Sequence, residues 1–183
     1  MNPADSQLRI IGGNWRGRKI SFTSFAEIRP TPDRIRETLF AWLQPDIHGS
    51  HCLDLYSGSG ILGVEALSRG AAHVTLVEKS RKTCDQLAAT MRSLDVSSEY
   101  FTIVNNSADA FLSTADGARQ DIIFVDPPFD STELQTIQPL IPRVLTAGGY
   151  VYVESGDQQP AHFAGLNRYR NKKAGKVSYA LYC

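Results

Sequence analysis

From residue 52 onward, the sequence alternates short apolar segments with longer amphipathic ones. The apolar segments predict strands over residues 52–56, 73–78, 100–105, 121–126 and 149–154. The segments between them predict helices over residues 61–69, 81–94, 108–112 and 133–145. Pro139 and Pro142 must bend or break the last of these helices. Strands that alternate with helices in this way predict an α/β fold with a mainly parallel, doubly wound sheet.

Short β segments are expected at both ends of the chain. Residues 8–24 contain apolar stretches broken by a pair of glycines, a pattern typical of a small hairpin with basic residues facing outward. Apolar residues alternate with others over 177–181, which predicts a final hairpin with one buried face. We therefore expect a basic N-terminal β-hairpin extension over residues 1–28 and one α/β domain over residues 29–183.

Charge is distributed unevenly along this chain of 183 residues, although its formal net charge is zero. Residues 1–20 carry a balance of +3 and residues 156–183 a balance of +4, so the middle of the chain holds −7. Basic ends around an acidic body favour a polyanionic partner that is contacted at the ends. Two solvated charged segments would produce the same pattern.

The three cysteines are too few and too widely separated for a disulfide framework or a zinc cluster, and they indicate a reducing compartment. No apolar stretch approaches the roughly 20 residues that a helix needs to span a bilayer. We therefore expect a cytoplasmic protein with no membrane segment and no bound metal.

A glycine-rich loop follows the first strand of the α/β region. Gly58, Gly60 and Gly63 match the pattern G-x-G-x-x-G, and Glu78 ends the next predicted strand. Such glycines let the backbone approach a nucleotide closely, and an acid at that edge can bind ribose hydroxyls. The loop alone is compatible with NAD. Asp54, just before the loop, disfavours a pyrophosphate and suits the ammonium group of a methionine moiety.

The turn Asp126-Pro127-Pro128-Phe129 follows an apolar run that reads as a buried strand. Two prolines fix φ and remove two backbone donors, so their carbonyls face no competing N–H groups. The Asp126 carboxylate and the Pro127 carbonyl can accept both hydrogens of an exocyclic amine, while Phe129 can stack on the ring that carries it. The alternative is an ordinary Asp-Pro turn with a core phenylalanine.

These features together resemble the class I S-adenosylmethionine-dependent methyltransferases. Residues 54–63 look like their first motif, Glu78 like their ribose-binding acid, and residues 126–129 like their amino-methylating signature. A closer likeness is carried by residues 9–13, 16–19, 29–31, 33–40, 65–71, 124–129 and 152–154. These segments are similar to the bacterial 16S rRNA guanine-N2 methyltransferases of the RsmD type. The resemblance implies a Rossmann-like, seven-stranded, mainly parallel sheet.

The resemblance also implies residue roles. The cofactor contacts it implies are Thr31, Asp54, Tyr56, Ser57, Gly58, Gly60, Glu78, Lys79, Asp109, Ala110 and Asp126. The catalytic residues would be Asp126, Pro127 and Phe129, and the RNA contacts Arg16, Arg18, Lys19 and Arg29. Three of these residues have simpler interpretations: Thr31 as a helix N-cap, Asp109 as an acid at a helix start, and Lys79 as a solvated side chain.

The activity implied is transfer of a methyl group from S-adenosylmethionine to the N2 amine of a guanine in 16S rRNA, within an assembling small ribosomal subunit and by a monomer. Adenine-N6 methylation of RNA or DNA is the nearest alternative, although a DNA enzyme usually needs a target-recognition region for which there is no room here. Protein-glutamine methylation is disfavoured because its turn typically begins with Asn. A non-catalytic RNA-binding assembly factor is the alternative outside the enzymes.

Overall fold

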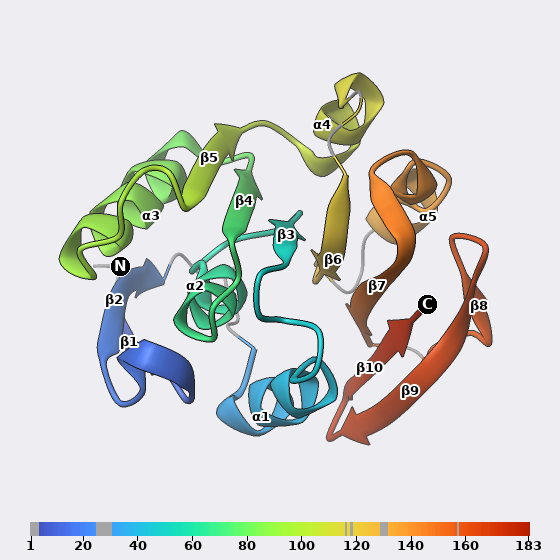
Figure 1. Ribbon diagram of the computed structural model, residues 1–183, viewed down its shortest axis with the longest axis horizontal. Helices are drawn as coiled ribbons and strands as arrows, with labels where there is room; N and C mark the ends of the chain where they lie inside the picture. The colour runs from blue at the N-terminus through green and yellow to red at the C-terminus, as the bar shows by residue number, and fades with distance from the viewer. Residues whose placement is uncertain (1–3, 25–30, 116, 118, 129–131, 157) are drawn as a thin grey trace.

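The computed structural model describes residues 4–24, 31–115, 117, 119–128, 132–156 and 158–183. Its centre is one large sheet (Figure 1), whose strands are, in spatial order, β5 (Phe101–Asn105), β4 (His73–Glu78), β3 (His51–Asp54), β6 (Gln120–Val125), β7 (Leu145–Ser155), β10 (Val177–Tyr182), β9 (Leu166–Ala174) and β8 (His162–Phe163). The strands from β5 to β7 run parallel, and β10, β9 and β8 each run antiparallel to the strand before them. The predicted mainly parallel sheet is confirmed, with the two-residue β8 added to the seven strands expected.

Helices cover both faces of the sheet. α1 (Asp33–Trp42), α2 (Ile61–Ser68) and α3 (Arg81–Ser93) pack on one face, while α4 (Ala108–Thr114) and α5 (Glu133–Ile137) pack on the other. In β6, Phe124 contributes to the first core and Val125 to the second. The strand therefore reads as a continuous apolar run because both of its faces are buried.

The segment predicted as a helix over residues 133–145 is broken at its prolines. α5 ends at Ile137, and the 3₁₀ helix η2 (Ile141–Arg143) follows. Pro139 and Pro142 lack the backbone donors that a continuous helix needs there. The longest helix in the described part of the chain, α3, has 13 residues, and no helix there is long and apolar enough to cross a membrane.

The predicted N-terminal hairpin is confirmed as a separate two-stranded antiparallel sheet, β1 (Ala4–Arg9) and β2 (Lys19–Ser24), with the 3₁₀ helix η1 (Gly13–Trp15) in its loop. Figure 1 shows it in blue, beside α2 and far from the orange and red strands β8 and β9. The predicted domain boundary between residues 28 and 29 lies outside the described residues.

Candidate active site

A cavity of about 1300 Å³ opens at the carboxyl edge of the parallel strands. The chain passes from β3 to β4 and β5 on one side, while β6 and β7 continue the sheet on the other. Ligands of open α/β sheets bind at such a switch point. The lining includes the ends of all five parallel strands, the start of α1, residues of the helices α2 to α5, and the turn over residues 174–177 between β9 and β10. The cavity has room for a nucleoside-containing cofactor and a second flat ring.

Glu78 connects the glycine loop to the end of β4. Its Oε2 accepts a hydrogen bond from the backbone N–H of Gly58 at 3.0 Å, and its Oε1 accepts one from the N–H of Ser80 at 2.7 Å. Each carboxylate oxygen has a further lone pair. Glu78 can therefore also accept hydrogen bonds from hydroxyl groups in the cavity, which is the geometry that a ribose contact needs.

Gly60 shapes the glycine loop but does not line the cavity. It is the N-cap of α2 with φ of +77°, and a Cβ atom at this position would lie 2.4 Å from Cδ2 of Leu87 on α3. The glycine pattern includes Gly60 because its left-handed backbone conformation favours a glycine. Gly60 is not among the residues that line the cavity, so the lining does not support the cofactor contact expected of it. Ala110, another expected contact, is also absent from the lining.

We expect Gly60→Ala to lower the free energy of unfolding by about 1–3 kcal/mol, because alanine is strained at this φ and its Cβ meets Leu87. Chemical denaturation measures the loss. Gly165→Ala is the matched control, since Gly165 has φ of +82° and a Cβ atom added there would have no neighbouring atom within 4 Å. The loss should be larger at Gly60, and equal losses would show that the contact with Leu87 is relieved at no cost.

Asp54 is a buried carboxyl group at the end of β3. Only 2% of its surface is exposed, and backbone N–H groups of Tyr56 and Gly63 hydrogen-bond it. Burial raises the pKa of Asp54 to about 7, with a further contribution from the negative charge of Asp126 and opposition from the two N–H bonds. A cationic group in the cavity would favour ionisation of Asp54 and would be held by it.

Asp126 follows β6 and receives a hydrogen bond from the start of α1. Thr31 Oγ1 donates to Asp126 Oδ2 at 3.2 Å. The interpretation of Thr31 as a helix N-cap is wrong, because Pro32 occupies the N-cap position and Thr31 makes no capping bond. Burial raises the pKa of Asp126 to about 7, and the Thr31 bond opposes that rise. Pro127, next along the chain, also lines the cavity.

Glu154 is a lining residue for which the sequence pattern predicted no role. It ends the buried part of β7, with 2% of its surface exposed, and its Oε1 accepts a hydrogen bond from the hydroxyl of Tyr152 at 2.7 Å. Burial and the charge of Asp126 raise the pKa of Glu154 to about 8, and hydrogen bonds with Tyr152 and Thr31 oppose that rise. The sequence signal that could have found it is an acid at the end of an apolar run that predicts a strand, which is also the position of Asp126.

The structure brings most of the predicted site residues to this cavity. The predicted residues that line it are Thr31, Asp54, Tyr56, Ser57, Gly58, Glu78, Lys79, Asp109, Asp126 and Pro127. Asp109 also stands in the first turn of α4, so both interpretations of this residue describe its position. Phe129 and Arg29 lie outside the described residues.

The predicted RNA contacts that are described lie away from the cavity, on the N-terminal hairpin. Arg16, Arg18 and Lys19 are all exposed. Arg18 Nη2 donates to the Ser93 carbonyl at 2.7 Å, which ties this basic loop to the end of α3. At the opposite end of the sheet, residues 169–173 of β9 are also exposed, and three of them are basic.

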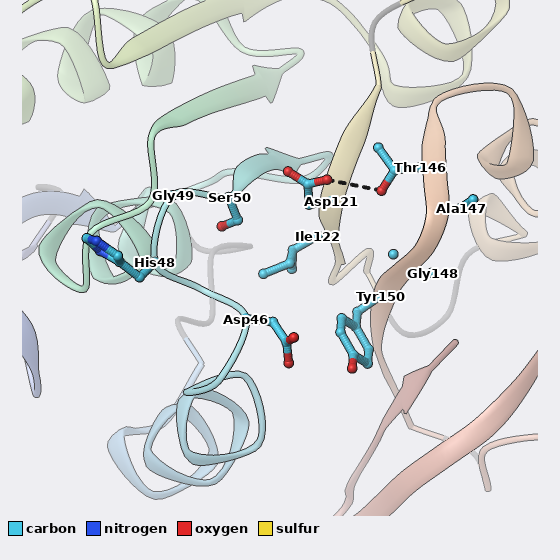
Figure 2. Close-up of a pocket in the computed structure, with 11 residues that line it drawn as sticks. Asp46, His48, Gly49, Ser50, Asp121, Ile122, Thr146, Ala147, Gly148 and Tyr150 are labelled. Atoms are coloured by element: carbon cyan, nitrogen blue, oxygen red, sulfur yellow. Dashed lines mark hydrogen bonds between the residues drawn. The ribbon is translucent and has the colours of Figure 1, made fainter.

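A second, smaller cavity of about 280 Å³ lies at the amino edge of the sheet (Figure 2). Two acidic residues, Asp46 and Asp121, line it, and Asp121 is already engaged, because Oδ2 accepts from the N–H of His51 at 2.9 Å and Oδ1 accepts from Thr146 Oγ1 at 3.1 Å. The cavity is below the usual size of small-molecule sites. These contacts fasten β3, β6 and β7 together. Within the described residues, no cluster of three or more His, Cys, Asp or Glu side chains could hold a metal ion.

Comparison with known proteins places these features in a family. The family model described as Conserved hypothetical protein 95 matches residues 8–183. The ribosomal RNA small subunit methyltransferase D of Escherichia coli strain K12 is 43% identical over 180 residues, which cover 96% of this chain and 89% of that protein. The corresponding protein of Haemophilus influenzae is 39% identical and covers 98% of this chain and 95% of its own length.

The solved structure of yhhF from Escherichia coli superimposes with a TM-score of 0.85 at 41% identity, covering 97% of both chains. This agreement extends over the hairpin as well as the sheet, because nearly the whole chain is included. The protein therefore belongs to the family described as Conserved hypothetical protein 95, together with the ribosomal RNA small subunit methyltransferases D.

Proposed function

We propose that this protein transfers a methyl group from S-adenosylmethionine to the N2 amine of a guanine in 16S rRNA. The observation that carries the proposal is the cavity in which the glycine loop and the carboxyl group of Asp126 line the same space. Family membership supports rRNA as the substrate, since the relatives are named small subunit methyltransferases. An assembling small subunit in the cytoplasm is the form of the substrate that we propose, with the protein acting as a monomer.

The charges of the cavity suit this methyl donor, which brings an activated sulfonium and an ammonium group. Asp54, Asp126 and Glu154 are carboxyl groups at the cavity, and the ion pairs found in the described residues involve none of them. Positive charges in the cavity would therefore meet acids that have no cationic partner. Asp54 would hold the ammonium group and Glu78 the ribose hydroxyls. Lys79, Asp109 and the loop residues Tyr56, Ser57 and Gly58 would border the rest.

Asp126 would act on the acceptor amine. The N2 lone pair of guanine is delocalised into the ring, so the amine is a weak nucleophile. Hydrogen bonds from its two hydrogens to Asp126 and to the Pro127 carbonyl would favour a pyramidal amine with its lone pair directed at the methyl group. Because the methyl group is already activated, positioning and electrostatics supply most of the acceleration. Phe129 would stack on the base, which must leave the RNA helix to reach the cavity.

Incubation with donor labelled in its methyl group tests the proposal. Naked 16S rRNA and assembled small subunits are each offered as substrate, and the methylated nucleoside is then identified and mapped. We expect N2-methylguanosine at one position. Formation of N6-methyladenosine would establish the alternative reaction, and binding of rRNA without any incorporation would support a non-catalytic assembly factor.

The basic N-terminal loop would bind RNA phosphates, with Arg29 adding to this surface. We expect the triple variant Arg16→Ala, Arg18→Ala, Lys19→Ala to raise the Kd for RNA on the order of 10-fold at low salt and to flatten its salt dependence. Filter binding across a salt series measures both effects. Arg81→Ala is the control, because Arg81 is exposed on α3 and pairs with Asp85. Equal effects of the two variants would contradict a specific RNA surface.

A further inference from the structure

Asp126 and Glu154 are neighbours at the cavity. β6 and β7 pair in parallel register with Val125 opposite Val153, so the next residue of each strand occupies an adjacent position on the same face. Both residues line the cavity, but Glu154 is almost completely buried whereas Asp126 keeps part of its surface open. The two acids therefore have different surroundings although they share one edge of the sheet.

One hydroxyl group joins the two carboxyl groups. Thr31 Oγ1 donates to Asp126 Oδ2 at 3.2 Å, and the same side chain hydrogen-bonds Glu154. A threonine hydroxyl has one proton and two acceptor lone pairs. It cannot donate to both acids at once, so its contact with the second acid requires a proton on that carboxyl group.

Burial decides which acid carries this proton. Ionisation costs most where the group is least accessible to water, and Glu154 is the more buried of the two. Among the described residues, no ion pair brings a lysine or arginine to either acid. Tyr152 donates to Glu154 Oε1, which leaves the other oxygen of Glu154 to carry a proton toward Thr31.

We infer that Glu154 is protonated at neutral pH and donates to Thr31, whose own proton then goes to Asp126 and keeps Asp126 ionised and oriented. The donors and acceptors form one chain, from Tyr152 through Glu154 and Thr31 to Asp126, in which each hydroxyl has one acceptor. Glu154 is thus a positioning residue that acts through Thr31. The inference rests on the proposed function only for what Asp126 does once it is ionised.

The electrostatics of the surrounding groups agree with this assignment. The pKa of Glu154 is raised to about 8 by burial and by Asp126, and that of Asp126 to about 7 by burial. The pKa of Tyr152 is raised well above its ordinary value, so it stays a donor. The other titratable groups that line the same cavity are Asp54, Tyr56, Glu78, Lys79, Asp109, Glu133 and Lys176. Burial and the neighbouring carboxyl group therefore oppose ionisation of both acids at once.

Infrared spectroscopy of the ligand-free protein tests where the proton is. At neutral pH the wild type should show the carbonyl stretching band of a protonated carboxylic acid, and this band should disappear as the pH rises through about 8. Asp54, whose pKa is raised to about 7, adds to this band at neutral pH, so the component that titrates near pH 8 is the one assigned to Glu154. Glu154→Gln should lose that component, while Asp126→Asn and Asp54→Asn should keep it. A component that persists in Glu154→Gln and vanishes in Asp126→Asn would overturn the inference. This measurement needs neither RNA nor donor, so it stands or fails separately from the proposed function.

Methyl transfer tests the positioning role. Glu154→Gln keeps a hydrogen-bond donor at position 154, whereas Glu154→Leu keeps only the size of the side chain. At pH 7 the Gln variant should therefore be about tenfold more active than the Leu variant, which corresponds to the loss of one hydrogen bond. Above pH 8 the wild type should lose activity that Glu154→Gln retains, because only the wild type can ionise there. Equal activities of the two variants, or the same pH profile in wild type and Glu154→Gln, would contradict the role.

Discussion

Asp126→Ala is expected to lower the rate of methyl transfer by about 10²–10³-fold, which is the usual effect of removing one preorganised polar group from a transition state. The variant loses the acceptor that orients the amine, while the cavity and its glycine loop are kept. Single-turnover transfer to rRNA measures the rate. Calorimetric titration with the donor should show nearly unchanged affinity. Asp54 is the residue proposed to hold the ammonium group, and removing the charge of Asp126 lowers the pKa of Asp54 and so favours its ionised form.

Asp126→Asn is the matched variant, since it preserves the shape of the side chain and removes only the charge. If the charge orients the amine, Asn should be impaired nearly as strongly as Ala. Full activity of Asp126→Ala would contradict the mechanism, and a large loss of donor affinity in both variants would mean that Asp126 serves the cofactor more than the amine.

Glu65→Ala is expected to lower the free energy of unfolding by about 3–5 kcal/mol, because it removes the only fully buried carboxylate that pairs with the buried Arg36 in the described residues and leaves that arginine with the partly exposed Asp33. Glu65 and Arg36 are both completely buried and lie 3.3 Å apart from Oε2 to Nη1. Glu65 also accepts from the N–H groups of Ile11 and Gly12 at 2.9 and 2.7 Å and from Arg69 Nε at 3.0 Å. One carboxylate thus joins α1 and α2 to the loop of the N-terminal hairpin.

Thermal and chemical denaturation measure this loss, and the melting temperature should fall by roughly 2–4 °C for each kcal/mol. The double variant Glu65→Leu, Arg36→Met removes both charges and should recover part of the loss, although the N–H groups of Ile11 and Gly12 stay without their acceptor. Asp85→Ala is the control, because the Asp85–Arg81 pair is exposed and worth at most about 0.5 kcal/mol. If Glu65→Ala lowered the free energy of unfolding no more than Asp85→Ala, the stabilising role of the buried Glu65 carboxylate would be contradicted.

The same network connects the hairpin to the cavity. Arg36 Nε donates to the carbonyl of Thr31 at 3.2 Å, and Thr31 donates to Asp126. Arg36 Nη2 also donates to the carbonyl of Arg9 on β1 at 3.0 Å. The basic hairpin and the residue proposed to act on the amine are therefore held by one buried arginine. RNA bound at the hairpin would meet a cavity whose position relative to it is fixed.

Local patterns were sufficient for most of the fold. The run over residues 121–125 predicted a strand covered on both faces, and Pro139 and Pro142 predicted the break after α5. The glycine pattern placed the loop between β3 and α2, because a left-handed backbone such as that of Gly60 is a local requirement. These predictions succeeded since each depends on residues close together in the sequence.

Contacts between segments that are distant in the sequence could not be predicted from local patterns. The sequence pattern places Gly13 in a hairpin turn, yet a Cβ atom there would lie 1.8 Å from the carbonyl oxygen of Ser68, so this glycine also permits the hairpin to approach α2. The two-residue β8 pairs with β9 over too few residues to leave a pattern. Both features depend on segments that are distant in the sequence.

The sequence by itself determined the alternation of strands and helices, the loop at the end of β3 and the acid–proline turn after β6, because backbone conformation and burial pattern are local. Only the tertiary structure decided the partners. It turned Thr31 from a possible cap into a donor to Asp126, placed Glu154 beside that acid, and joined Glu65 to Arg36 and the hairpin. Hydrogen bonds between buried groups depend on which strands are neighbours, and strand order is fixed by packing of the whole chain.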